Sequence, residues 1–189
     1  ICFIGVMIIR LVFILFNTFV LLRLTSFVDS GILKTDDDAK VIIRNMNLIA
    51  VCSQVFFFKI SGTIADKYPA YITIPCSFVL RAISIAFFIQ IEDPRSILSY
   101  LITVILVLAS FSENTTVDGL FTKNLPKDIR GTLNGVYAFF GNIGLLVFSK
   151  VGGYLYDGYG PTYPFIFVAC CDIAFALFLV ILRMLKLFN

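Results

Sequence analysis

Polar and charged side chains that interrupt long apolar runs are the residues of this sequence best placed to do chemistry. The first apolar run carries Arg10 and Asn17, which are seven residues apart and therefore share one face of a helix. Arg81 and Asp172 each lie near the middle of a later run. Polar groups inside a membrane are costly, so each of them needs a partner or a role in moving a solute.

Other kinds of chemistry have little support in the sequence. It contains no His, and its five cysteines all lie in apolar runs without a Cys-x-x-Cys pair. We therefore predict no metal site, no disulfide framework and no cofactor. No Ser or Cys has a base at a suitable spacing and no two carboxylates pair at one depth, so we predict that the protein is not an enzyme. Basic residues are scattered, which argues against a nucleic-acid partner.

The composition identifies the lipid bilayer as the solvent of this chain. Hydrophobic residues make up 59% of the 189 residues and charged residues only 14%, and the mean hydropathy is +0.97. A soluble domain is about half apolar and a quarter charged. The apolar runs are continuous rather than alternating, which predicts helices and excludes a transmembrane barrel.

The chain has room for six helices of about 20 residues, the length that spans a bilayer. We expect an all-α integral membrane fold with helices at about 3–27, 41–64, 71–91, 96–117, 132–156 and 163–187. Gly and Pro residues between 157 and 161 stop the fifth helix. The chain begins inside an apolar run without Met, and we interpret it as a fragment or the second part of a longer protein.

A short motif follows the second helix and has an echo after the fifth. Gly62-x-x-x-Asp66-Lys67 joins the second and third helices, and Gly153-x-x-x-Asp157 has the same spacing. The two copies are one three-helix unit apart, on opposite faces of the membrane. This placement favours two inverted three-helix repeats.

The Gly62–Lys67 motif resembles the signature loop of the major facilitator superfamily (MFS) of transporters. Arg130-Gly131 followed by Gly135, at the start of the fifth helix, adds to this resemblance. It implies that residues 1–189 form the C-terminal six-helix half of a twelve-helix transporter, with the N-terminal half of the same protein absent. The implied function is transport of a small solute, of unknown identity, by alternating access.

The resemblance also implies a gating role for the signature loop. The residues that we assign to this gate are Gly62, Asp66, Lys67, Glu113, Arg130 and Gly131. Gly62 would allow a neighbouring helix to approach closely, and Asp66 would latch the two halves or simply cap a helix. The family usually has Gly and Arg after Tyr68, where this sequence has Pro69 and Ala70. Glu113 either joins the gate or is hydrated near the membrane surface.

A second set of residues is predicted to face the solute pathway. It consists of Arg10, Asn17, Gln54, Tyr100, Thr103, Asn134, Tyr137 and Asn142. Arg10 either belongs to an inner gate or extends to the lipid headgroups. On the fifth helix, a stripe of small residues from Gly131 to Gly153 either packs closely on another helix or accompanies Asn142 along the pathway.

In the family the third and sixth helices pack together, away from the cavity. The resemblance therefore implies that Arg81 and Asp172 form a buried ion pair with a structural role. Proton coupling through Asp172 is the competing role, and Lys150 is an alternative partner for Asp172.

The distribution of basic residues predicts the orientation. Six of them fall on the side of the signature loop and the C-terminus: Lys67, Lys123, Lys127, Arg130, Arg183 and Lys186. Positive residues favour the cytoplasmic side, so we expect loop 65–70 and the C-terminus in the cytoplasm and Asn114 without a glycan. A non-transporting receptor or structural membrane subunit with the same fold is the alternative function.

Overall fold

The computed structural model describes residues 1–126 and 128–187, so Lys127 lies outside the described residues. Within these ranges it contains six helical spans that are long and apolar enough to cross a membrane. The first span is made of α1 (Cys2–Ile14), the π-helical turn η1 (Leu15–Phe19) and α2 (Val20–Asp29). The others are α3 (Asp36–Lys67), α4 (Ala70–Ile89), α5 (Ile97–Lys123), α6 (Arg130–Tyr159) and α7 (Tyr163–Met184). The largest difference from the expected bounds is the end of α5, expected at 117 and observed at Lys123.

Local sequence signals explain where several helices begin and end. Thr35 caps α3: its hydroxyl accepts from the Asp38 amide, and the Asp38 carboxylate accepts from the Thr35 amide. Three aspartates in the first turn of α3 suit the positive end of the helix dipole. Gly160 ends α6 at a φ of 115°, a conformation that residues with a side chain rarely adopt.

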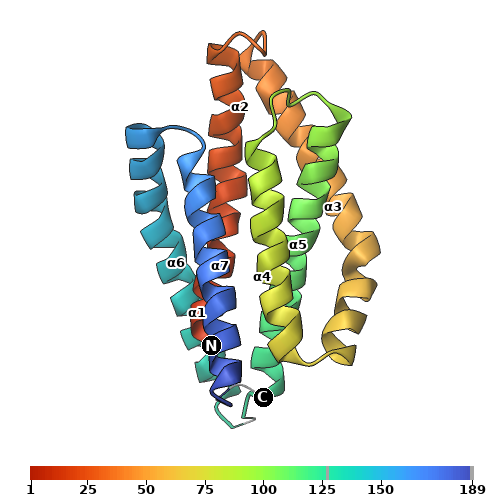
Figure 1. Ribbon diagram of the computed structural model, residues 1–189, viewed down its shortest axis with the longest axis vertical. Coiled ribbons are helices and arrows are strands. Elements are labelled where there is room, and N and C mark those ends of the chain that lie inside the picture. Colours follow the sequence, from red (N-terminus) through yellow and green to blue (C-terminus); the bar gives the residue numbers. More distant parts are fainter. Residues whose placement is uncertain (127, 188–189) are drawn as a thin grey trace.

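The helices pack in pairs that match an inverted repeat. α1 packs on α6, and α5, the equivalent helix of the second triplet, packs on α3. α4 and α7, the last helices of the two triplets, pack on each other. Figure 1 shows both chain ends at the lower end of the bundle, together with the α3–α4 and α5–α6 connections. The first helix of each triplet thus packs on the second helix of the other triplet, as expected for two inverted repeats.

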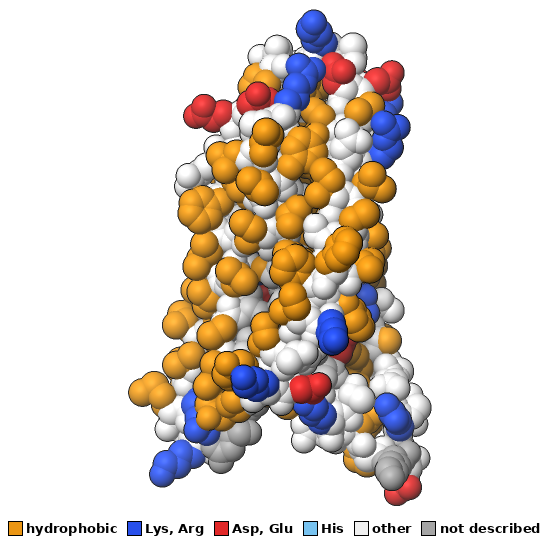
Figure 2. Space-filling view, turned by 90° about the vertical axis from the view of Figure 1, so that its right-hand side faces the viewer, with side chains coloured by type: hydrophobic (Ala, Val, Ile, Leu, Met, Phe, Trp, Pro, Cys, Tyr) orange, Lys and Arg blue, Asp and Glu red, His pale blue; other side chains and the backbone are white. Residues whose placement is uncertain are grey.

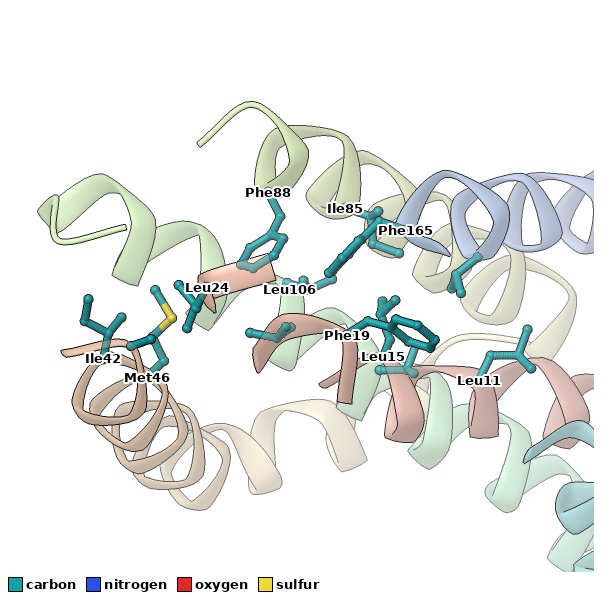
Figure 3. Packing of buried hydrophobic residues seen from close by; sticks show 14 of the residues in the cluster. Leu11, Leu15, Phe19, Leu24, Ile42, Met46, Ile85, Phe88, Leu106 and Phe165 are labelled. Atoms are coloured by element: carbon teal, nitrogen blue, oxygen red, sulfur yellow. The ribbon is translucent and has the colours of Figure 1, made fainter. Parts of the chain in front are cut away.

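The larger apolar core lies toward the upper half of the bundle. Leu15, Phe19, Leu106, Phe148 and Phe165 are all at most 3% exposed, and they come from η1, α5, α6 and α7. Figure 3 shows side chains from α1, η1, α2, α3, α4, α5 and α7 meeting in one cluster, to which α6 adds Phe148. Because every helix contributes to it, this cluster holds the two triplets together.

The surface has the character of a membrane protein. Figure 2 shows hydrophobic side chains covering the middle of one face, with Lys, Arg, Asp and Glu gathered at its two ends. Large apolar side chains such as Phe56 and Leu146 are more than 70% exposed. In water such a surface would aggregate, whereas in lipid it is the favourable one. The chain is therefore an integral, multi-pass membrane protein.

The stripe of small residues on α6 has no close helix contact within the described part of the chain. Among the described residues, a Cβ atom added at Gly131, Gly135 or Gly153 would have no neighbour within 4 Å. The close contact between α6 and α1 lies on a neighbouring face of α6, where a Cβ at Gly144 would lie 2.5 Å from the backbone oxygen of Met7 in α1. The regularly spaced stripe from Gly131 to Gly153 is therefore mostly exposed in this chain. Gly144, on a neighbouring face of α6, is the glycine that lets α1 pack closely.

Candidate functional site: a polar cavity and a buried charge cluster

A cavity of about 560 Å³ lies between α1, α3 and α5. Three predicted pathway residues, Arg10, Asn17 and Gln54, line it together. Its other polar side chains, which were not predicted to face the pathway, are Asn47, Ser110 and Asn114. Phe13, Phe16 and Phe111 supply aromatic walls. A cavity with amide groups, one cation and aromatic surface has the character of a small-molecule site.

The π-helical turn η1 helps position the cavity residues. It contains Asn17, whose side-chain amide donates a 2.7 Å hydrogen bond to the Phe13 carbonyl one turn earlier. A π-turn inserts one extra residue per turn and frees backbone groups, and such turns are frequent at functional sites. Arg10 lies at one side of the cavity, and its aliphatic stem passes α6 at Gly141, where an added Cβ would be only 3.2 Å away. Gly141 thus leaves room for Arg10.

The remaining predicted pathway residues lie outside this cavity. Thr103 is buried, and its hydroxyl donates to the Ser99 carbonyl of its own helix. Tyr100 packs against the apolar core. Asn134 and Asn142 are exposed on α6. Tyr137 donates a 2.6 Å hydrogen bond to Asp118 and stacks on Phe121, with ring centroids 4.1 Å apart, so its side chain is held by two residues of α5.

Arg81, Glu113 and Asp172 form a buried charge cluster on α4, α5 and α7, and each is 0% exposed. The Arg81 guanidinium donates from Nε to Asp172 Oδ2 over 2.8 Å and from Nη2 to Oδ1. Arg81 Nη1 contacts Glu113 Oε2 in a second ion pair. The structure thus brings Arg81 and Asp172 together and adds a second carboxylate to them.

The assignment of Glu113 to the signature-loop gate, or to a hydrated position, is wrong. α5 continues to Lys123, so Glu113 lies ten residues, or about 15 Å, from the helix end. At that depth its side chain turns into the bundle toward Arg81. Lys150 is exposed, and the structure pairs Asp172 with Arg81 instead.

At the lower end, the signature loop forms an ion pair that the sequence did not reveal. Lys123, at the end of α5, donates a 3.0 Å hydrogen bond to Asp66, at the end of α3. Gly62, Lys67 and Lys123 line one depression there. A Cβ at Gly62 would meet nothing within 4 Å among the described residues, so no helix of this part of the chain approaches closely there. Arg130 and Gly131 are exposed in the first turn of α6.

Arg23 is a further buried cation that sequence reasoning did not single out. It is 7% exposed. Its guanidinium donates to the Ile89 carbonyl over 2.5 Å and to the Thr162 hydroxyl over 3.2 Å. It also lies within 6 Å of the rings of Phe27, Phe88 and Phe165. Its position inside an apolar run, like that of Arg81, was the available signal.

Comparisons with known proteins agree with this architecture. Residues 2–187 match the family model described as Major Facilitator Superfamily. A stretch of 61 residues is 36% identical to the magnetosome protein MamH of Paramagnetospirillum magneticum (strain ATCC 700264 / AMB-1). That stretch covers 32% of this chain and only 14% of MamH. No solved structure matches the chain. Because the family model covers nearly every residue of the six-helix bundle, the chain belongs to the major facilitator superfamily of membrane transporters.

Proposed function

We propose that this chain is the C-terminal half of a secondary transporter that moves a small solute by alternating access. The solute binds in the cavity between α1, α3 and α5. The N-terminal six-helix half of the same protein supplies the opposite wall, and rocking of the two halves exposes the cavity to each side in turn.

The observation that carries this proposal is the set of polar side chains on the cavity wall. Asn17, Asn47, Gln54 and Asn114 come from three helices of a chain that is 59% hydrophobic, yet they line one space. Amide groups facing lipid would be costly, so their gathering in one place argues for a wet, solute-binding surface. No carboxylate lines the cavity, and Arg10 is its single charged side chain among the described residues.

The exposed stripe of α6 supports a partner half. Gly131, Gly135, Ala138, Asn142 and Ser149 lie along it, and Asn142 and Ser149 are exposed although Asn and Ser are poorly suited to lipid. Small residues at spacings of three and four allow another helix to pack closely. We propose that a helix of the N-terminal half covers this face.

Uptake by proteoliposomes that contain the full-length protein tests the proposal. A panel of labelled sugars, amino acids, nucleosides and organic anions serves as probes. We expect uptake of at least one class, with a loss of tenfold or more in Asn17→Ala and Gln54→Ala. Gln90→Ala, which changes an amide in the α4–α5 turn, is the matched control and retains uptake. Uptake that both cavity variants leave unchanged would contradict this assignment of the pathway.

A non-transporting receptor or structural membrane subunit is the second candidate. The observation that favours it is the signature loop, which has Pro69 and Ala70 where the family usually has Gly and Arg. Binding of a solute to the purified protein without uptake in the same panel would support this candidate.

A further inference from the structure

Arg10 is a cation of α1 that lies deep in the bundle. Its stem passes Gly141, where an added Cβ would lie 3.2 Å from the Arg10 Cγ and 3.4 Å from its Nε. Gly141 is eleven residues into α6, or about 16 Å from the lower end of that helix. Half of the hydrocarbon core of a bilayer is about 15 Å thick, so Arg10 meets α6 near the middle of the membrane. A charge at that depth needs a compensating partner.

The described part of the chain does not supply that partner. Among its residues, none forms an ion pair or a hydrogen bond with the Arg10 guanidinium. The two acids of α5 are engaged elsewhere. Glu113 contacts Arg81, and Asp118 accepts a hydrogen bond from the Tyr137 hydroxyl. The positive charge of Arg10 is thus left for a ligand that carries a negative charge.

The cavity wall around Arg10 carries further hydrogen-bond donors. Asn47 and Gln54 are seven residues apart on α3, so they share a face of the helix, and both line the cavity. Neither side chain makes a hydrogen bond to another described residue. Asn17 donates one amide hydrogen to the Phe13 carbonyl and retains a second. An ionised carboxylate is the acceptor that guanidinium and amide N–H groups bind most strongly.

The remainder of the cavity wall is largely apolar. Phe13, Phe16 and Phe111 line the cavity beside the donors. A small inorganic anion would leave these rings in contact with water, whereas a solute with an aryl or branched alkyl body covers them. The single cation of this wall suits a single negative charge.

We propose that the cavity binds a monoanionic organic solute, a carboxylate with an aryl or branched alkyl body, and that Arg10 pairs with the carboxylate. This assignment rests on the proposed transport function, because it names the class of solute that the cavity moves. A neutral analogue leaves Arg10 uncompensated when it is bound, and a cationic analogue places a second positive charge beside it. Both therefore bind more weakly than the anion.

Equilibrium binding to the full-length protein in lipid nanodiscs tests this class with matched solutes. Phenylacetate and 4-methylpentanoate are compared with their neutral amides, which share the apolar body. The 2-phenylethylammonium ion adds a positive charge to the same ring, and acetate has the carboxylate without the body. We expect at least one of the two carboxylates to bind tenfold or more tighter than its amide, the ammonium ion and acetate.

Three variants test whether Arg10 is the origin of this preference. In Arg10→Gln the ratio of the affinities for the carboxylate and its amide should fall at least tenfold, and this ratio does not depend on the fraction of protein that is folded. Arg10→Lys keeps the charge but loses the planar fork, so it should retain part of the preference. Arg44→Gln changes an exposed arginine of α3 that does not line the cavity, and this matched control should keep the ratio.

Several outcomes would overturn the proposal. They are failure of both carboxylates to bind, equal binding of a carboxylate and its amide, equal binding of acetate, and a preference that Arg10→Gln leaves unchanged. Binding of a carboxylate with the expected preference but without uptake would contradict the transport proposal alone. Uptake of neutral or cationic solutes by a protein that binds neither carboxylate would contradict the anion assignment alone.

Discussion

Asp66 and Lys123 connect the lower ends of α3 and α5, with 3.0 Å between the carboxylate oxygen and the ammonium nitrogen. The side chains are 74% and 60% exposed. The family's loop usually carries an arginine, but here the loop has Ala70 and the cation comes from another helix. The structure thus restores a charge pair at the signature loop from a residue 57 positions away in the chain.

We predict that this pair affects transport rather than stability. An exposed pair contributes about 0–1 kcal/mol, so Lys123→Glu should hardly change the melting temperature. Uptake should fall severalfold because two helix ends on the gating side repel each other, and the exchange Asp66→Lys with Lys123→Glu should restore it. Lys40→Glu is the control, since the exposed Lys40–Asp37 pair lies within one helix. Equal effects of Lys123→Glu and Lys40→Glu on uptake would contradict the prediction.

The Arg81 cluster should respond differently to the loss of its cation and of its carboxylates. Arg81→Met leaves two buried carboxylates without a counter-ion, and we expect a loss of about 3–5 kcal/mol of stability or a failure to fold. Glu113→Gln retains the Arg81–Asp172 pair, so its melting temperature in detergent should stay close to that of the wild type. The exchange Arg81→Asp with Asp172→Arg should recover expression if the pair is structural. Normal expression of Asp172→Asn with altered dependence of uptake on pH would instead favour a coupling role for Asp172.

The sequence predicted the membrane fold well because lipid imposes long, continuous apolar segments, and their ends carry turn residues such as Pro69 and Gly160. It predicted the meeting of Arg81 with Asp172 through the resemblance. It misplaced Glu113, because the helix was expected to end at 117, close to Glu113, whereas α5 continues to Lys123. It did not identify Gly144 as the glycine that meets α1, since spacing identifies a face of small residues but not the neighbour that packs on it. Which glycine meets a backbone depends on the three-dimensional arrangement of α1 and α6.

Gly144 is predicted to be the glycine of α6 that tolerates substitution least. A Cβ there would lie 2.5 Å from the Met7 oxygen and 2.9 Å from the Met7 Cα, and neither backbone atom can move without shifting α1. We expect Gly144→Ala to cost about 1–3 kcal/mol, the usual range for overpacking. Gly158→Ala, in the last turn of the same helix and with no described atom within 4 Å of the added Cβ, should be neutral or slightly stabilising because alanine favours helices. Melting temperatures in detergent measure both, and similar values for the two variants would contradict the close contact.

Arg23 should be sensitive even to a conservative change. Its guanidinium reaches the Ile89 carbonyl at the end of α4 and the Thr162 hydroxyl before α7, and a lysine ammonium cannot reproduce this fork. Loss of the bonds leaves partly buried polar groups unpaired, at a cost of about 1 kcal/mol or more. We therefore expect Arg23→Lys to lower the melting temperature, whereas Arg44→Lys, an exposed arginine on α3, should not. A melting temperature of Arg23→Lys equal to that of the wild type would show that the fork does not stabilise the upper end.

The orientation of the bundle can be measured with single cysteines at its two ends. Lys67, Lys123 and Arg130 lie at the lower end, where Figure 1 places both chain termini, and this basic surplus favours the cytoplasmic side. In a background without the five native cysteines, a membrane-impermeant thiol reagent added to intact cells should label Lys34→Cys, in the exposed upper turn, and not Pro69→Cys. After permeabilisation both should react, which controls for accessibility. Asn114 should carry no glycan, because it lies within α5 on the wall of the cavity rather than in a loop. Labelling of Pro69→Cys alone in intact cells would reverse the orientation and with it the side on which the Asp66–Lys123 pair acts.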